Sequence, residues 1–485
     1  MRIRRFLLGA LCLGSVVLVV ADQPNILLVL SDDHSVPHLG AYGDENCIRL
    51  GLTPHLDRFA AEGMRFDRAY TSAPQCAPSR TAIFAGRSPV GLGATRFAQP
   101  ARRETRFFTD VLRENGYWVG LDGRHQHLDG KTRDHSHVTE LLVEMGVREE
   151  EFERRFDHFV RGVKTKGEEL EKVDEMMEAA LDKVPEGKPF FLYFGFSQPH
   201  RKWGDDHEGI DPARLALPPD WPDLPEIRLD YARYLSEVGD LDRGFGLIDS
   251  VLEKRGLKAN TLVIFMGDNG EALLRGKGTL NTRGIHVPLL ARWPGKIKPG
   301  SISDELVSGV DIAATILEAA DLGAPPGMTG MSFLNELRGE SFEGREYVFA
   351  ERGWHAGPLV RTDGLDLSRS VTTRRFHFVY NAIPERIYSP VDMRKNLAWL
   401  KMQALNERGE LSSLHERLYF RVPRPIFELY DLERDPFQLE NLAGSRELRS
   451  VEEELRVALD KWMVRESDFL PLPSDVQRYS KVVTK

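Results

Sequence analysis

The segment Cys76-Ala77-Pro78-Ser79-Arg80 has the residue types of an anion-binding site that also holds a nucleophile. Pro78 suits the start of a helix and Gly86 suits the position just after its end, so we predict a helix between them. Cys76 then lies at the N-terminal mouth of this helix, and Arg80 follows one turn later on the same face. Free N–H groups, the positive end of the helix dipole and a guanidinium group meet there. Together they suit an oxyanion such as sulfate or phosphate.

Two generic roles for Cys76 remain open, a buried structural side chain and a thiolate nucleophile. A cysteine protease is an unattractive alternative, because the local sequence has none of the known signatures of those enzymes. Cys47 and Cys76 are enough to form one disulfide bond on number alone. Two cysteines in an exported chain of this length do not make a disulfide scaffold.

Two short apolar runs, residues 25–30 and 261–266, each lead directly into a cluster of polar side chains. The first runs into Ser31-Asp32-Asp33-His34 and the second into Gly267-Asp268-Asn269-Gly270. Ligand sites of open α/β sheets lie at the carboxyl ends of the strands, so we expect both clusters at one edge. Three carboxylates and an amide oxygen suit Ca²⁺ or Mg²⁺. Capping of the next helix, or a turn, is the alternative for either cluster taken alone.

The elements that must position these residues alternate between strand-like and helix-like segments up to about residue 322. Residues 189–196 form another buried run, and helical spacing or end signals mark residues 53–63, 107–115 and 231–252, with Thr53 as the first helix's N-cap. Strands that alternate with helices predict an α/β fold, a mainly parallel sheet flanked by helices.

The alternation of strand-like and helix-like segments ends around residues 323–327, which are rich in proline and glycine. Beyond them, residues 371–380 and 426–432 alternate like antiparallel strands, and residues 447–465 form a charged helix. Length alone favours about three domains. The pattern favours two, a larger one at 22–325 and a smaller α+β domain at 326–485.

The N-terminus has the layout of a secretory signal peptide, which we place at residues 1–21. A basic start is followed by an apolar run at 6–20, which is short for a membrane span of about 20 residues. We therefore expect export to the periplasm or the extracellular space, with no membrane span after signal removal. The formal charge of −9 becomes −12 once the three arginines of the signal are lost, which argues against nucleic acid as a partner.

The Cys-x-Pro-Ser-Arg segment, followed by Gly86-Arg87, resembles the signature of the type I, formylglycine-dependent sulfatases of the alkaline-phosphatase superfamily. Further segments resemble that family in the same order: residues 25–33, 53–63, 189–200, 261–270, 276–279, 287–295 and 429–436. The likeness covers most of the mature chain. It implies an alkaline-phosphatase-like fold and a sulfatase catalytic domain at 22–325.

The resemblance implies that a formylglycine-generating maturation enzyme oxidises Cys76 to formylglycine. Its hydrated aldehyde is a geminal diol, of which one hydroxyl attacks sulfur and the other then expels sulfate. The residues that resemble ligands of a single Ca²⁺ ion are Asp32, Asp33, Asp268 and Asn269, with an oxygen of residue 76 completing the sphere.

Other catalytic roles are implied by position. Arg80 resembles the residue that holds the diol, Lys277 a group that contacts sulfate, and His200 the general acid. One segment departs from the family's Gly-Lys-x-His pattern, because it has Arg124 in place of the lysine. We assign the accompanying catalytic histidine to His127 because a leucine follows it, with His125 as the alternative.

The Arg-x-x-His variant and residues 275–279 resemble the heparan N-sulfatase subgroup. We therefore expect a sulfated carbohydrate as substrate, with Trp203, Trp354, His355 and the Arg374-Arg375 pair as potential sugar contacts. The nearest alternative is a phosphonate or phosphodiester hydrolase of the same superfamily. A binding protein that has lost activity would have a broken catalytic set, whereas every position here holds a competent residue.

Overall fold

A computed structural model describes residues 23–97, 99, 101–124, 128, 149–160, 165–205, 207, 209–355 and 364–473. Its centre is an eight-stranded sheet, with strands in the order β5 (His158–Phe159), β4 (Trp118–Gly123), β6 (Phe190–Gly195), β1 (Asn25–Ser31), β7 (Thr261–Gly267), β8 (Leu289–Arg292), β2 (Met64–Phe66) and β9 (Ser301–Ser303). The strands from β5 to β7 are parallel, and β8 runs antiparallel to both neighbours. The predicted α/β fold with a mainly parallel sheet is confirmed.

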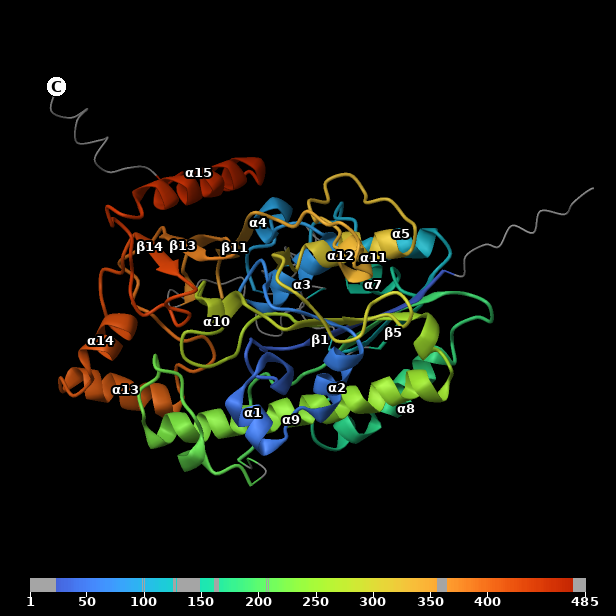
Figure 1. Cartoon of the computed structure of the whole chain (residues 1–485), viewed down its shortest axis with the longest axis horizontal. Helices are drawn as coiled ribbons and strands as arrows, with labels where there is room; N and C mark the ends of the chain where they lie inside the picture. The colour runs from blue at the N-terminus through green and yellow to red at the C-terminus, as the bar shows by residue number, and fades with distance from the viewer. Residues whose placement is uncertain are drawn as a thin grey trace, which may run out of the picture.

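Helices cover both faces of this sheet, which explains why β6 and β7 are buried along their whole length. One face carries α2 (Pro54–Glu62), α8 (Val173–Leu181) and α9 (Pro225–Lys254). The other carries α3 (Cys76–Ala85), α5 (Phe108–Glu114), α11 (Asp311–Ala319) and α12 (Leu334–Arg338), and Figure 1 shows the two groups on opposite sides of the strands.

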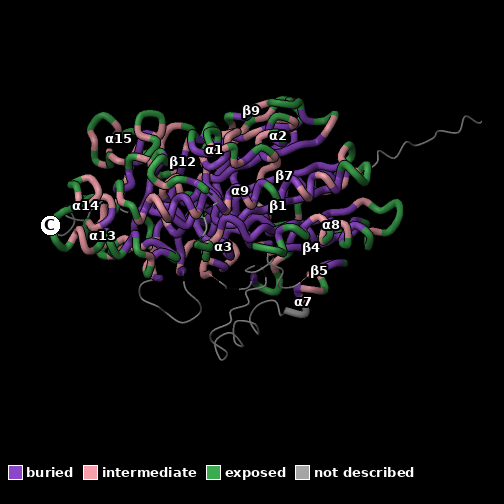
Figure 2. The backbone as a smooth tube through the Cα atoms, turned by 90° about the horizontal axis from the view of Figure 1, so that it is seen from below, coloured by how far each residue is buried: buried purple, intermediate pink, exposed green. Residues whose placement is uncertain are grey.

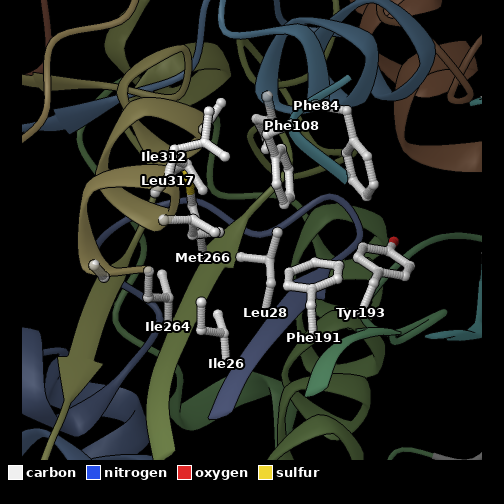
Figure 3. Packing of buried hydrophobic residues seen from close by; sticks show 14 of the residues in the cluster. Ile26, Leu28, Phe84, Phe108, Phe191, Tyr193, Ile264, Met266, Ile312 and Leu317 are labelled. Carbon is white, nitrogen blue, oxygen red and sulfur yellow. The ribbon is translucent and has the colours of Figure 1, made fainter. Parts of the chain in front are cut away.

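Figure 3 shows the packing on the second face, where Phe84 of α3 and Phe108 of α5 lie over Phe191 and Tyr193 of β6. The ring centroids of Phe84 and Tyr193 are 5.5 Å apart, and those of Phe108 and Phe191 are 5.0 Å apart. These edge-on contacts fix the helix that begins at Cys76 against the strand that leads towards His200.

Thr53 is the N-cap residue of α2, as predicted, with Pro54 at the first helical position. Its side chain makes no cap hydrogen bond, and its hydroxyl accepts from the Gly40 N–H at 2.9 Å. One local prediction needs correction. Residues 371–380 are not one strand. They contain the end of β12 (Ser368–Thr372) and most of β13 (Phe376–Asn381), because the chain reverses at 373–375.

The C-terminal part contains a four-stranded antiparallel sheet in the order β11 (Val348–Arg352), β12, β13 and β14 (Phe427–Asp431). Helix α15 (Arg449–Arg465) packs on β12 and β13, and α13 (Leu397–Glu407) packs on α9. The predicted small α+β unit is confirmed. The remaining elements are β3 (Ala69–Tyr70), β10 (Val307–Ser308), α1 (Glu45–Leu50), α4 (Pro89–Leu92), α7 (Glu149–Glu153), α10 (Thr282–Ile285), α14 (Ser413–Tyr419) and 3₁₀ turns at 40–42, 167–172, 212–214 and 258–260.

Burial is continuous through β1, β6 and β7 apart from Asn25, and α9 buries the side chains that face the sheet, as the purple segments in Figure 2 show. The division of the chain into domains at 22–325 and 326–485 remains a proposal. Helix α12 follows the proposed boundary but packs in the core of the larger domain. In the described part of the chain, no helix has the length and apolar character needed to cross a membrane. The proposed signal peptide at 1–21 lies outside the described residues.

Candidate active site

The two acidic clusters meet because β1 and β7 are neighbouring parallel strands whose last residues, Ser31 and Gly267, lie side by side. The Asp33 N–H donates to Asp268 Oδ1 at 3.0 Å, and Asn269 Nδ2 donates to Asp33 Oδ1 at 2.9 Å. These side chains are fully buried. Their predicted meeting at one edge of the sheet is therefore confirmed.

Cys76 is the first residue of α3, so the helix begins two residues earlier than Pro78 predicted. Proline is tolerated there because N–H groups in the first turn have no partner within the helix. The Ser79 N–H donates to the carbonyl of Gln75, the N-cap residue, at 3.0 Å. Cys76 Sγ lies 3.3 Å from Asp32 Oδ1, and Cys47 and Cys76 are both free thiols.

Arg80 is fully buried one turn after Cys76 and connects the two acidic clusters. Its Nε donates to Asp268 Oδ2 at 2.8 Å, and its Nη2 lies 3.2 Å from Asp32 Oδ2. Its Nη1 donates to the Tyr193 hydroxyl at 2.5 Å. A planar guanidinium with several donors suits this role better than a lysine would.

Two further predicted cations reach the same carboxylates. Arg124 follows β4, and its Nε lies 2.5 Å from Asp32 Oδ2. Lys277 is almost fully buried, with its Nζ 2.9 Å from Asp33 Oδ1. Three cations from separate parts of the chain thus surround Cys76 and the two aspartates.

His200 follows β6 and is the more open member of the site, with 17% of its side chain exposed. Its Nε2 lies 3.8 Å from Asp33 Oδ2, and the residue lines a cavity of about 480 Å³ together with Trp203. His200 therefore marks the side of the site that borders a cavity. His127, and its alternative His125, lie outside the described residues.

The charges of the site are unevenly compensated. Burial alone would raise the pKa of Asp32, but Arg124, His200 and Arg80 lower it below its usual range. Burial raises the pKa of Asp33 to about 7, because Lys277 opposes the shift only partly and the neighbouring aspartates add to it. The two neighbouring carboxyl groups therefore differ: Asp32 is ionised at neutral pH, whereas Asp33 still holds part of its proton.

Burial and the nearby Asp32 raise the pKa of the Cys76 thiol well above its usual range. Reactive cysteines instead have a lowered pKa in electropositive, partly exposed surroundings. The unmodified thiol is therefore neutral at neutral pH and poorly suited to attack as a thiolate.

The donor set fits a hard divalent cation. Asn269 Oδ1 is buried and accepts no hydrogen bond from the residues that the structure describes, and Asp32 Oδ2 has ion-pair contacts with Arg80 and Arg124 but no hydrogen bond within that part of the chain. One ligand atom each of Asp32, Asp33, Cys76 and His200 lies within 4.8 Å of the others. Asp268 is not in this group; its Oδ1 accepts from the N–H groups of Asp33 and Asn269, and its Oδ2 accepts from Arg80 Nε. The oxygens of Asp268 and Asn269 suit calcium better than the His200 ring nitrogen does, because calcium prefers carboxylate and amide oxygens.

Comparison with known proteins identifies the family. The sulfatase family model matches residues 24–322, and the model for the C-terminal part of N-sulphoglucosamine sulphohydrolase matches residues 270–393. The chain belongs to the sulfatase family. The resemblance to that family, including its N-sulfatase-like subgroup, is confirmed, and the protein is accordingly a sulfuric ester or sulfamate hydrolase.

Two relatives match nearly the whole sulfatase chain. An ulvan-active sulfatase of Formosa agariphila is 28% identical over 464 residues, covering 93% of this chain and 82% of the relative. Human N-sulphoglucosamine sulphohydrolase is 28% identical over 478 residues, covering 91% and 90%. A solved structure concerned with glycosaminoglycan metabolism by Bacteroides thetaiotaomicron is 21% identical with a TM-score of 0.69, covering 92% of this chain and 97% of that chain. This last likeness shows the fold.

The structure brings residues into this sulfatase site that the sequence did not indicate. Asp392, from the smaller C-terminal part, places Oδ2 2.9 Å from Lys277 Nζ. Its other oxygen lies 3.9 Å from His355 Nε2. Asp392 lies in a loop without a motif, so no sequence signal marked it. Tyr193, whose hydroxyl accepts a hydrogen bond from Arg80, lies within an apolar strand, and the sequence gives no sign of this contact.

The expected sugar contacts have different outcomes. Trp203 lines the cavity beside His200, and His355 lies near Asp392. Trp354 stacks under the Arg96 guanidinium at 4.1 Å. The two neighbouring arginines, Arg374 and Arg375, form ion pairs at the β12–β13 hairpin and are not among the residues around Cys76.

Proposed function

We propose that this sulfatase hydrolyses sulfate esters or sulfamates of a sulfated carbohydrate, using formylglycine derived from Cys76 and one Ca²⁺ ion. The observation that carries this proposal is the position of Cys76, at the start of α3, 3.3 Å from Asp32 and one turn before the buried Arg80. The ulvan-active and N-sulphoglucosamine relatives support a polysaccharide or glycosaminoglycan substrate.

The neutral, buried thiol supports maturation of Cys76 by a formylglycine-generating enzyme. Arg80 is held by two aspartates and Tyr193, so it can orient the hydrated residue 76 without moving itself. A second hydroxyl on residue 76 allows sulfate to leave by elimination, without water having to attack a stable sulfate ester.

The remaining residues divide between anion binding and proton transfer. We assign Lys277 and Arg124 to the sulfate oxygens, because both cations border the Asp32–Asp33 pair. We assign His200 as the general acid for the leaving oxygen and His127 as the accompanying base. Burial, with Lys277 and Arg124, lowers the pKa of His200 well below its usual range. An anionic substrate beside the ring favours its protonated form.

Asp32, Asp33, Asp268 and Asn269 would hold the calcium ion, with residue 76. Such an ion acts as a Lewis acid that lowers the pKa of a bound nucleophile. Charge also favours it: the carboxylates of Asp32, Asp33, Asp268 and Asp392 outnumber the cations Arg80, Arg124 and Lys277. An anionic sulfate ester or sulfamate group would enter this site more easily once a divalent cation had reversed that balance.

We further propose that the protein is exported, with residues 1–21 as its signal, and that it acts in the periplasm or outside the cell. Its partners are then the maturation enzyme and the carbohydrate substrate; the acidic net charge of −9 argues against nucleic acid.

The test is release of inorganic sulfate from a panel of N- and O-sulfated saccharides. Mature protein co-produced with a formylglycine-generating enzyme is compared with Cys76→Ala produced in the same way. Release by the wild type alone supports the proposal, and the active substrate separates a sulfamidase from a sulfate esterase. A converted protein that releases no sulfate but cleaves phosphonate or phosphate diesters would overturn it.

A further inference from the structure

A second cavity, of about 610 Å³, lies in the C-terminal part of the molecule. It is bounded by β12, β13 and β14, by α14, and by the segment 278–281 that follows Lys277. The arginines that line it are Arg275, Arg352, Arg386, Arg417, Arg421 and Arg424. Its acidic lining residues are Asp366, Glu428 and Glu440. The cavity is thus cationic, although the chain as a whole is acidic.

Arg352, the last residue of β11, is the anomaly of this cavity. It is 4% exposed, and its Nε and Nη1 are buried without a hydrogen-bond partner among the described residues. No described carboxylate lies within ion-pair distance of it. An arginine this deeply buried is costly to leave unpaired, so its donors call for an acceptor.

The neighbouring groups do not supply that acceptor. The Asp366 carboxylate is already bound by the Arg424 guanidinium through contacts of 2.7 and 3.1 Å. Arg275, also in the lining, donates to the carbonyls of Phe437 and Gln438. Burial, together with Arg424 and Arg394, lowers the pKa of Arg352 to about 10.

The cavity also lies directly beside the active site. Arg352 Nη1 is 3.0 Å from the position that a Cβ atom would take at Gly278, the residue after Lys277. Gly278 has a φ of 81°, a conformation that other residues rarely adopt. A side chain at this position would collide with Val391 and press on the Arg352 guanidinium, so glycine allows these groups to pack against the segment that carries Lys277.

We infer that this cavity is a second anion site, in which Arg352 binds a sulfate or carboxylate group carried by an acidic saccharide. The choice of a saccharide as the source rests on the proposed function, because a sulfated chain carries several anionic groups near the one that is removed. A free inorganic anion has the same oxygen chemistry, and the experiment separates the two.

The experiment measures calorimetric binding of a heparin-derived tetrasaccharide, and separately of sodium sulfate, to protein that has not received formylglycine. This protein cannot turn over, so binding is measured without hydrolysis. We expect Arg352→Gln to weaken tetrasaccharide binding by about 10-fold or more, the effect of losing charge-assisted hydrogen bonds. The matched control is Arg434→Gln, which removes a charge that is 82% exposed and should leave the affinity unchanged.

Ser389→Trp provides a second variant, because Ser389 also lines the cavity and a much larger side chain there should fill part of it while keeping Arg352. This variant should weaken tetrasaccharide binding, as Arg352→Gln does. Melting temperatures separate binding from structure: replacing an unpaired buried arginine should not lower the melting temperature.

Unchanged tetrasaccharide affinity in both cavity variants would overturn the inference, as would a marked loss of melting temperature in Arg352→Gln. Sodium sulfate that binds as tightly as the tetrasaccharide, in an Arg352-dependent way, would overturn the saccharide assignment. Sulfate release by the matured wild type tests the proposed function independently of these results.

Discussion

Glu351, in β11, connects the C-terminal sheet to the chain on both sides of the nucleophile helix. Its Oε2 accepts from the Val90 N–H at 2.8 Å, and its own N–H donates to the Ser72 carbonyl at 3.0 Å. The side chain is 1% exposed, and Oε1 has no hydrogen-bond partner in the described part of the chain. Glutamine at this position keeps the acceptor for Val90 and resembles the protonated acid in shape.

Burial raises the pKa of Glu351 to about 8. Arg369 opposes this shift, but its charge is shared with Asp468, which it binds at 2.8 Å. In the unfolded chain the pKa returns to about 4.3. The folded state therefore holds a proton that the unfolded state loses as the pH rises between these two values. The stability associated with the neutral carboxyl is present below about pH 4 and is lost as the pH rises towards about 8.

We therefore expect the free energy of unfolding of the wild type to fall relative to Glu351→Gln as the pH rises. One pKa unit corresponds to about 1.4 kcal/mol, so the difference should grow by roughly 3 to 4 kcal/mol between about pH 5 and about pH 8. The assay is denaturant or thermal unfolding of both proteins across this range. Exposed Glu340→Gln serves as the control and should run parallel to the wild type. Parallel curves for Glu351→Gln as well would refute the reasoning, since the buried carboxyl would then be ionised throughout.

Three further predictions concern the active site. Cys76→Ser should complete one turnover and leave a sulfated serine, visible by peptide mass, because serine has no second hydroxyl; repeated turnover would contradict the diol mechanism. Asn269→Leu should reduce calcium affinity in calorimetry of chelator-treated protein, because the buried Oδ1 is lost; unchanged affinity would remove Asn269 from the ligand set. Lys277→Met should lower the free energy of unfolding by about 3 to 5 kcal/mol, because it leaves the fully buried Asp33 without its ion-pair partner. The surface variant Lys258→Met should cost less than about 1 kcal/mol, and equal losses would show that burial of the pair is unimportant.

Much of the site could be predicted from local sequence, because residues that follow two neighbouring parallel strands lie at the same edge of the sheet. Once residues 25–30 and 261–266 are parallel neighbours, Asp32 and Asp268 must emerge at the same edge of the sheet. The relation between Cys76 and Arg80 is equally local, since it needs only one helical turn. These features depend on short-range geometry that the residue types fix.

The parts that could not be predicted depend on contacts between distant segments or on competing local signals. Asp392 reaches Lys277 across more than a hundred residues, from a loop whose course the C-terminal sheet determines. Arg352 reads as an ordinary strand residue until its burial is known. Pro78 placed the start of the helix too late, because a proline fits any position in the first turn. The strand predicted at 371–380 missed a hairpin that has no glycine or proline to mark it.

The most direct test of the central claim relates sulfate release to the modification of residue 76. Samples with graded formylglycine content are prepared by varying co-production of the maturation enzyme, and the converted fraction is measured by mass spectrometry of the peptide that contains residue 76. We predict that the rate of sulfate release is proportional to the converted fraction and falls to zero in unconverted protein. Sulfate release at full rate from protein that retains the Cys76 thiol would contradict the account.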